Sequence, residues 1–591
     1  MTTRLTRRRF LILATSTAGV GLAAACTPIA PPAPAATSAP SAPAPGASPA
    51  AAAGPAATSK PIAPVAAASP AAAASPVAAV ASPGASPVAG ASPAAGAAPA
   101  PAAAPKPAAA NPNAKKGGTL TFARTADISS FNPTLLQPGH YPFLRALYNT
   151  PVRYDQTLNP QADLAETFEL SPDGKTFKMT LKKGVQFHSG REVVAEDVAF
   201  TIDWFREPKN SSPVRTAVDL IKRVETPDKY SVTLGFDAPN PGVYDMLDLL
   251  FIVDKGSVDQ FANAANGTGP FKLAQYTPGD MARFTPNPNY FESGKPYLNE
   301  YVLKVTPDAQ TMAIQLESGA TDVIWIPNFN DLVRLGQDPK FLTSPGAPGA
   351  FFWDVAVNTS APDLSDKRVR QAISYVIDRE RYAKTIMLGL VPPTSLNVPS
   401  TSWAYFKDLE GAHARNIDKA KQLMADAGKS AGFDAVLLTS SKRGAGMGEL
   451  AQILQNDLAQ INIRAKIDDL EVAVYETRNR ESQFDLSCHS YGRANKDPGT
   501  LYTGAIAWFP KGSWTKIDDP AYAAQIQKAG GLVDRAARLP EYRKLQEYAL
   551  DQCFTIPVCE QPRAFAWNKK VQDFAVTLDN IPYVGDMWLN S

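Results

Sequence analysis

The chain has 591 residues, enough for several domains, and 58 Lys and Arg against 56 Asp and Glu give a net charge of +2. This balance excludes the strong basic bias of a nucleic-acid-binding protein. Four cysteines are too few for a disulfide framework. We interpret Cys488, Cys553 and Cys559 as ordinary buried thiols.

Residues 1–26 have the anatomy of an export signal: a basic start, an apolar run from Phe10 to Val20, and small residues up to Cys26. The stretch Thr6–Leu11 resembles the twin-arginine consensus. The stretch Leu22–Cys26 resembles a lipobox, which predicts a lipidated Cys26 as the first mature residue and a membrane anchor. Ala23 stands where that pattern normally has Leu, so cleavage by the ordinary signal peptidase and an uncleaved anchor remain alternatives.

Residues 27–113 consist almost entirely of Ala, Pro, Ser and Gly, with recurring Ala-Ser-Pro units. A segment with so little apolar periodicity cannot build a core, and it predicts a disordered tether. As a flexible coil such a tether would span about 50 Å.

From Gly118 onward the pattern mixes strands and helices without an internal repeat, and no later stretch has the run of apolar residues that a membrane span needs. A turn at Ser171–Lys175 separates two expected strands. The expected strands are 118–123, 167–170, 176–181 and 435–438, and the expected helices are 195–205, 367–387, 418–427, 449–459 and 532–551.

Several segments, in this order, resemble the family 5 extracellular solute-binding proteins, the peptide, dipeptide and nickel receptors of ABC transporters. They are Asp163–Glu166, Ser171–Lys175, Gly184–Gly190 followed by Ala195–Val198, Gly267–Phe271, Asn287–Phe291, Val357–Thr359 and Asp366–Arg379. We interpret most of these segments as structural, for example as hairpins and helix caps.

The resemblance implies an α/β, two-lobed periplasmic-binding-protein-like fold of class II and the large family 5 type, with hinge strands and an interlobe ligand cleft. Lobe 1 would comprise residues 114–355, completed by 561–591, and lobe 2 would comprise 356–560. The chain would cross between them at 351–358 and 556–567. A cleft between two lobes is a usual place for a small molecule.

The resemblance also implies where the solute binds. The stretch Tyr491–Pro498 matches the family's ligand loop, in which an aromatic residue is followed by an acid that holds a peptide's amino group. Tyr491 matches the aromatic residue, but Ala494 occupies the acid's position, and Ala cannot pair with an ammonium group. The neighbouring Arg493 would instead favour a carboxylate. The candidate ligand-binding residues are Tyr141, Trp403, Tyr491, Arg493, Asp497 and Trp508.

We found no catalytic set. The Gly-x-Ser-x-Gly motif at Gly428–Gly432 follows a helix, whereas the nucleophile elbow needs a strand before it. The four histidines are scattered without zinc spacing, so we expect no metal site and no cofactor, although a nickel chelate stays open as a solute. The sequence therefore predicts a monomeric, non-enzymatic, lipid-anchored receptor on the outer face of the cytoplasmic membrane. It would deliver a peptide-like or other small solute to ABC permease subunits. The alternatives are a secreted α/β hydrolase and a solute sensor on the same fold.

Overall fold

The computed structural model describes residues 111–590, apart from 126, 129, 136–139, 157, 326–327, 345–347, 492–495 and 578–579, and gives only the backbone of 348–350 and 506. All described residues fall in one compact unit. The predicted signal, including Cys26, and residues 27–110 of the predicted tether lie outside the described residues, as do Arg493 and Ala494. Asn111, near the end of the predicted tether, donates to Tyr297 and Asp573, so the ordered chain begins slightly earlier than expected.

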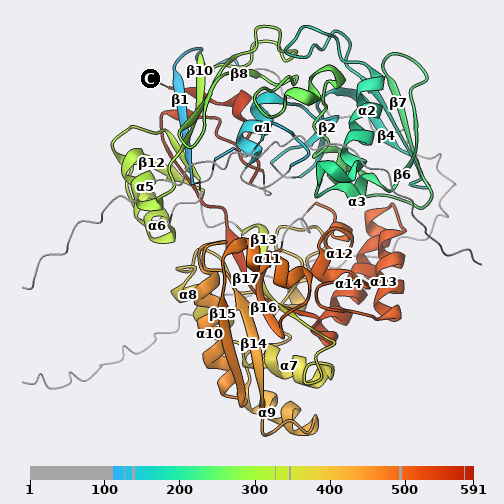
Figure 1. Cartoon of the computed structure of the whole chain (residues 1–591), viewed down its shortest axis with the longest axis vertical. Helices are drawn as coiled ribbons and strands as arrows, with labels where there is room; N and C mark the ends of the chain where they lie inside the picture. Colours follow the sequence, from blue (N-terminus) through green and yellow to red (C-terminus); the bar gives the residue numbers. More distant parts are fainter. Residues whose placement is uncertain are drawn as a thin grey trace, which may run out of the picture. The chain divides into compact units, whose positions relative to one another are not determined.

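Two large sheets organise the described chain (Figure 1). The seven-stranded sheet has the order β12 (Phe341–Thr343), β18 (Phe565–Asn568), β11 (Val323–Trp325), β1 (Thr119–Arg124), β10 (Glu300–Val305), β9 (Met281–Pro286), β8 (Phe271–Thr277). The five-stranded sheet has the order β15 (Ile463–Asp469), β14 (Phe433–Thr439), β16 (Leu486–Tyr491), β13 (Pro348–Val357), β17 (Thr555–Pro562).

Smaller sheets accompany the seven-stranded one. A four-stranded antiparallel sheet has the order β4 (Ala165–Leu170), β5 (Thr176–Leu181), β7 (Ser231–Phe236), β6 (Ile221–Glu225), and two ribbons pair β2 (Val152–Tyr154) with β3 (Pro160–Ala162) and β19 (Val571–Gln572) with β20 (Trp588–Leu589). We call the part built on the seven- and four-stranded sheets lobe 1, and the part built on the five-stranded sheet lobe 2.

The helices divide between the lobes in chain order. Lobe 1 contains α1 (Tyr141–Leu147), α2 (Ala195–Arg206), α3 (Arg215–Val218), α4 (Val243–Leu247), α5 (Ala309–Glu317) and α6 (Phe329–Gln337). Lobe 2 contains α7 (Lys367–Val376), α8 (Arg379–Thr385), α9 (Ile417–Asp426), α10 (Met447–Ala459), α11 (Val472–Arg480), α12 (Gly499–Gly504), α13 (Pro520–Gly530) and α14 (Arg535–Gln552). No helix among the described residues is long and apolar enough to cross a membrane.

The chain passes between the two large sheets twice. It leaves the seven-stranded sheet after β12 and enters the five-stranded sheet as β13, and it returns from β17 to β18. Strands β13 and β17 pair antiparallel, so both passages start from neighbouring strands of lobe 2. Their pairing shifts register between Trp353 and Asp354, whereas β13 and β16 pair without a break. The predicted lobe boundaries at 355/356 and 560/561 stay predictions, because both strands run through or past them.

Most expected elements are confirmed, and one is corrected. The helix expected over 367–387 is two helices, because Ile377 adopts an extended backbone and the side chain of Asp378 accepts from Arg381 N to cap α8. Asp366 caps α7 in the same way, through Arg368 N. Cys488, Cys553 and Cys559 are buried free thiols, as expected.

Two of the segments that resemble the family, Gly184–Gly190 and Gly267–Phe271, are hydrogen-bonded to each other or to α1 in lobe 1. His188 N donates to Gly267 O at 2.7 Å, and Gly269 N donates to Leu147 O at 2.9 Å. A Cβ atom on Gly267 would lie 2.0 Å from Leu147 O, and one on Gly269 would lie 2.3 Å from Ala146 O. These glycines therefore allow the loop to touch the backbone at the end of α1, which is a structural role.

We predict that Gly269→Ala lowers the free energy of unfolding by about 2–3 kcal/mol, because the added methyl group meets backbone atoms that cannot move aside easily. Thermal denaturation measures the effect. Gly504→Ala, where nothing lies within 4 Å of the added atom, is the control, with an expected change of about 0.5 kcal/mol or less. Equal stability of the two variants would contradict the close approach.

Candidate functional site

Strands β13 and β16 bring an acid, an imidazole and a phenol to one face of the lobe 2 sheet. Their register places Asp354 opposite His489 and Phe352 opposite Tyr491. Directly opposite residues of an antiparallel pair point to the same face, and residues two apart on a strand share that face. Asp354, His489 and Tyr491 are therefore neighbours, and we call them the β13–β16 polar cluster.

Aromatic rings pack around this cluster. The His489 ring stacks on Tyr491 at 4.3 Å between centroids and lies edge-on to Trp514 at 5.1 Å. On its other side it stacks on Tyr475 of α11 at 6.0 Å. The guanidinium of Arg443 lies 5.8 Å from the Tyr475 ring and donates to Glu476. These rings and the strand register fix the orientation of the imidazole.

The cluster holds polar atoms without partners. Asp354 is 0% exposed, His489 3% and Tyr491 6%. Both carboxylate oxygens of Asp354, the Tyr491 hydroxyl and His489 Nε2 have no hydrogen-bond partner among the described residues. His489 Nδ1 contacts the backbone of Ser490, at 2.8 Å from its N and 2.9 Å from its O. Buried polar groups are normally paired, and unpaired ones cost about 1–3 kcal/mol each.

The electrostatics of the cluster agree with this geometry. Burial raises the pKa of Asp354 well above its ordinary value, and the Arg443 charge only partly opposes the rise. Burial, reinforced by Arg443, lowers the pKa of His489 far below its ordinary value. Without a ligand the cluster is therefore held toward its uncharged forms, and a cation beside Asp354 would be the group that most favours the carboxylate.

A buried ionic network joins the two lobes close to the strand that carries Tyr491. Lys496 Nζ donates to Asp248 Oδ2 at 2.8 Å, and Arg145 Nη2 donates to Asp248 Oδ1 at 2.6 Å. All three side chains are at most 3% exposed. Lys496 also lies 4.7 Å above the ring of Tyr154. Asp248 therefore connects a loop of lobe 2 to α1 of lobe 1.

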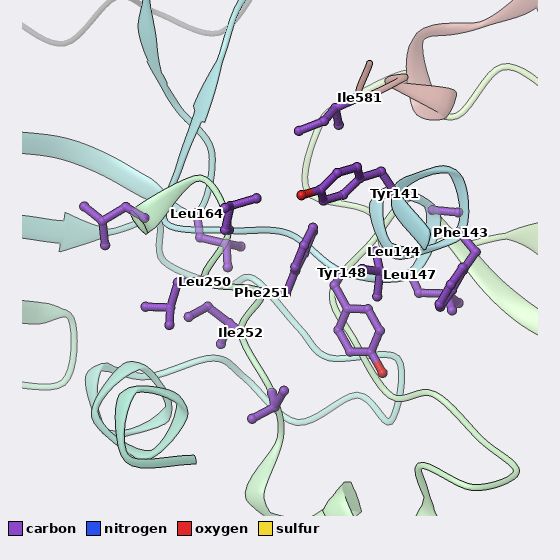
Figure 2. Close-up of a cluster of buried hydrophobic side chains, with 14 of the residues drawn as sticks. Tyr141, Phe143, Leu144, Leu147, Tyr148, Leu164, Leu250, Phe251, Ile252 and Ile581 are labelled. Carbon is purple, nitrogen blue, oxygen red and sulfur yellow. The ribbon is translucent and has the colours of Figure 1, made fainter. Parts of the chain in front are cut away.

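Two of the predicted ligand residues lie in hydrophobic cores. Tyr141 is 5% exposed in α1 and packs in the lobe 1 core (Figure 2), together with Phe143, Leu147 and Phe251. Trp508 is 1% exposed in lobe 2 and borders a cavity of about 10 Å³, roughly the room of one water molecule. Their role as ligand contacts stays a prediction.

Trp403 and Asp497 lie together at the lobe 2 end of the ionic network. Trp403 is half-buried, its Nε1 donates to Lys496 O at 3.0 Å, and its ring meets Tyr542 edge-on at 5.7 Å. Both Asp497 carboxylate oxygens accept from Arg538 at 2.7 Å. In the described residues Asp497 thus forms an internal ion pair, and its contact with a solute stays a prediction.

Sequence reasoning placed Tyr491 near a site but missed Asp354, His489 and the partners of Lys496. One signal was present: Asp354 is the single acid in the expected hinge stretch 351–358, which is otherwise mainly apolar. The lobe-to-lobe pairing of Lys496 with Asp248 joins residues 248 positions apart, which no local pattern reveals. Among the described residues no group of three or more His, Cys, Asp or Glu is arranged to hold a metal ion.

Comparison with known proteins gives consistent matches. Residues 159–513 match the model of the bacterial extracellular solute-binding proteins, family 5 middle. The dipeptide-binding protein of Escherichia coli is 26% identical over 499 residues, which cover 78% of this chain and 92% of that protein. The heme-binding protein A of Haemophilus influenzae is 25% identical over 486 residues, covering 75% of this chain and 87% of that protein.

Solved structures match over the same region. The Helicobacter pylori ABC transporter-associated periplasmic binding protein DppA, in complex with the peptide STSA, has a TM-score of 0.71 at 25% identity and covers 81% of this chain and 99% of its own. The Agrobacterium binding protein AgaA, in complex with agropinic acid, also has a TM-score of 0.71 at 25% identity and covers 80% and 99%. The two-lobed solute-binding fold expected from the sequence is confirmed.

We predict that Asp248→Asn lowers the free energy of unfolding by about 3–5 kcal/mol at pH 7, because it removes the buried carboxylate that Lys496 and Arg145 share. Although burial raises the pKa of Asp248, Lys496 and Arg145 outweigh it and lower that pKa. The carboxylate's contribution is therefore present above the unfolded-state pKa of about 4 and is lost as pH falls below it.

Urea unfolding at pH 7 and in the acid range measures both effects. Arg464→Gln is the control, because the Arg464–Asp434 pair is 59% and 83% exposed and should contribute about 0.5 kcal/mol or less. A deficit of Asp248→Asn that stays the same at low pH would argue against the ion network.

Proposed function

This chain belongs to the bacterial extracellular solute-binding proteins of family 5, and we propose that its solute is peptide-like and binds through a free amino group at Asp354. The family membership makes the chain the substrate-binding component of an importer rather than a secreted hydrolase. The observation that carries the proposal on the solute is the buried Asp354 carboxylate, whose two oxygens have no partner.

An ammonium group satisfies what the β13–β16 polar cluster lacks. It offers three N–H donors, and Asp354 offers two acceptor oxygens without other bonds. Charge-assisted hydrogen bonds of this kind are roughly twice as strong as neutral ones. A cation at this position would restore the ionised form of a carboxyl group whose pKa burial raises.

The location of the cluster supports the same role. Tyr491 is the last residue of β16, and the ligand loop identified in the sequence follows it directly. The expected acid of that loop is replaced by Ala494. Asp354 lies on the strand beside β16, so a carboxylate is available in the same sheet although the loop lacks one. Relatives named for dipeptide binding make a peptide-like solute the leading class.

We further propose that the chain is exported with its twin-arginine signal, is acylated at Cys26 and works as a monomer on the outer face of the cytoplasmic membrane. The lipobox-like sequence and the Ala/Pro/Ser-rich tether after it support an anchored receptor. In this arrangement the tether holds the lobes away from the membrane while the solute is passed to the ABC permease.

We predict that Asp354→Asn weakens binding of an unmodified dipeptide by about ten- to a hundredfold, since a hydrogen bond to a charged group contributes about 1.5–3 kcal/mol. Isothermal titration calorimetry with the full-length chain measures the affinity. An N-acetylated dipeptide, which lacks the ammonium group, should bind the wild type as weakly as the free dipeptide binds the variant.

The stability of the ligand-free protein separates this role from a structural one. The folded-state pKa of Asp354 is raised, so the wild-type protein loses stability as pH rises from the unfolded pKa toward the folded one. Asp354→Asn should therefore be as stable as the wild type, or more stable, at pH 8 while binding less dipeptide. A variant that both unfolds and binds poorly would point to a packing role.

For the anchor, we predict that the wild-type chain incorporates a labelled fatty acid in cells and fractionates with membranes. Cys26→Ser should lose the label and be released as a soluble exported protein. Membrane association that persists in Cys26→Ser without label would instead indicate an uncleaved signal anchor.

A further inference from the structure

A cavity of about 450 Å³ lies within lobe 2 and shares no lining residue with the β13–β16 polar cluster. Its wall consists of residues 377–380, 392–395, several residues between 405 and 415, and Glu560 of β17. Sites for small molecules typically measure 300–1,000 Å³ and combine an apolar wall with a few polar groups. This cavity has that size and that composition.

Two carboxylates face the cavity. Glu560 is 1% exposed, and among the described residues it accepts only from the backbone and the hydroxyl of Ser400. Glu410 accepts from Thr394 Oγ1 and from the backbone N and the hydroxyl of Ser395, at 3.0 and 3.2 Å. A carboxylate has about four acceptor positions. Glu560, with two donors, keeps capacity for another, whereas Glu410, which also bonds the Tyr405 hydroxyl, contributes mainly its charge.

Tyr405, Glu410 and Glu560 line the same cavity. Burial raises the pKa of Tyr405, and the charges of Glu410 and Glu560 raise it further. Burial likewise raises the pKa of Glu560 to about 6, and the Glu410 charge adds to the rise. The three groups thus form an acidic end of the cavity.

No ion pair among the described residues neutralises Glu410 or Glu560. The buried cation in the wall is Arg379, and its guanidinium is used by the backbone oxygens of Pro557, Ser374 and His413. The positive charge of Arg379 therefore makes the electrostatic potential in the cavity less negative, although Arg379 donates no hydrogen bond to either carboxylate.

The remaining ionisable groups of the wall are paired or neutral. Asp378 lies 3.6 Å from Arg415, and Glu380 lies 3.2 Å from Lys384. Burial lowers the pKa of His413 to about 4, so this ring is neutral at physiological pH. Lys407 is exposed. Two carboxylates without an ion pair, Glu410 and Glu560, thus stand against one buried guanidinium without an ion pair, so the buried part of the cavity favours a cation.

We propose that this cavity is a second binding site, for a small organic amine whose ammonium group lies between Glu410 and Glu560. The apolar part of the amine would pack against Ile377, Pro392 and Pro393, which line the same cavity. The ammonium group supplies donors to Glu560, and its positive charge relieves the repulsion between Glu560 and Glu410. This site is separate from the solute site at Asp354 and does not depend on it.

Benzylamine is a suitable probe, because it joins one ammonium group to one apolar ring, and benzyl alcohol is its uncharged counterpart. We expect benzylamine to bind the full-length chain at least about tenfold more tightly than benzyl alcohol in calorimetric titration. Binding should strengthen from pH 5 to about pH 7.5, because Glu560 ionises through about pH 6 while the amine stays protonated.

Substitutions of residues in the cavity wall test whether benzylamine binds there. Glu410→Gln and Glu560→Gln should each weaken benzylamine binding at least about tenfold, and Gln at position 560 can still accept from Ser400, so the fold is kept. Asp354→Asn should leave benzylamine binding unchanged, and a dipeptide should not compete with it. Lys511→Gln, an exposed position outside the cavity wall, is the matched surface control and should bind as tightly as the wild type.

Three results would overturn the proposal: no binding of benzylamine, equal binding of the amine and the alcohol, or unchanged binding in both glutamate variants. Loss of benzylamine binding in Asp354→Asn would indicate that the amine binds at the solute site instead. Because dipeptide affinity is measured on the same variants, failure of the second site and failure of the proposed solute site give different patterns.

Discussion

The antiparallel pairing of β13 with β17 is the constraint on which the rest of the structure depends. Strand β13 brings the chain from lobe 1 into lobe 2 and β17 leads it back, and both strands are central to the candidate sites. Asp354 lies on β13 and Glu560 lies on β17. Strands buried in a sheet need apolar side chains, so each acid costs stability where it stands. Acids kept in such positions indicate ligand chemistry more strongly than acids on the surface do.

The ionic network around Asp248 has a different role from these acids. Asp248 accepts from both Lys496 and Arg145, and Asp497 pairs with Arg538 beside it. A buried ion pair repays its desolvation only when geometry and partners are complete, and it then specifies one arrangement over others. The contrast is informative: the paired acids fix how the lobes meet, whereas the unpaired Asp354 is left for something that the chain does not supply.

Much of the fold could be predicted from the sequence, because turns, caps and helix periodicity are local. Asp366 caps the start of α7, and Gly428 follows the end of α9 with a positive φ. The order of the segments that resemble the family identified the two-lobed architecture. The break at Ile377 was missed, since the apolar pattern continues through it. The site was harder to predict: Asp354 lies opposite His489 only through strand register, and Glu410 and Glu560 line one cavity only because a loop packs on β17. Such contacts depend on the pairing of segments that are far apart in the sequence, and neither composition nor motif spacing reveals that pairing.

The register shift between Trp353 and Asp354 bears on how the protein moves. A bulge loosens one strand pair and lets it twist, while the pair on the other side of the same strand keeps its ladder. Strand β17 is thus the compliant neighbour of β13, and β16 is the stiff one. Bending between the lobes would be absorbed on the β17 side, so the recognition surface made by β13 and β16 would keep its shape through each opening and closing. The receptor would then present a preformed surface to its solute, and little of the binding energy would be spent on reshaping it.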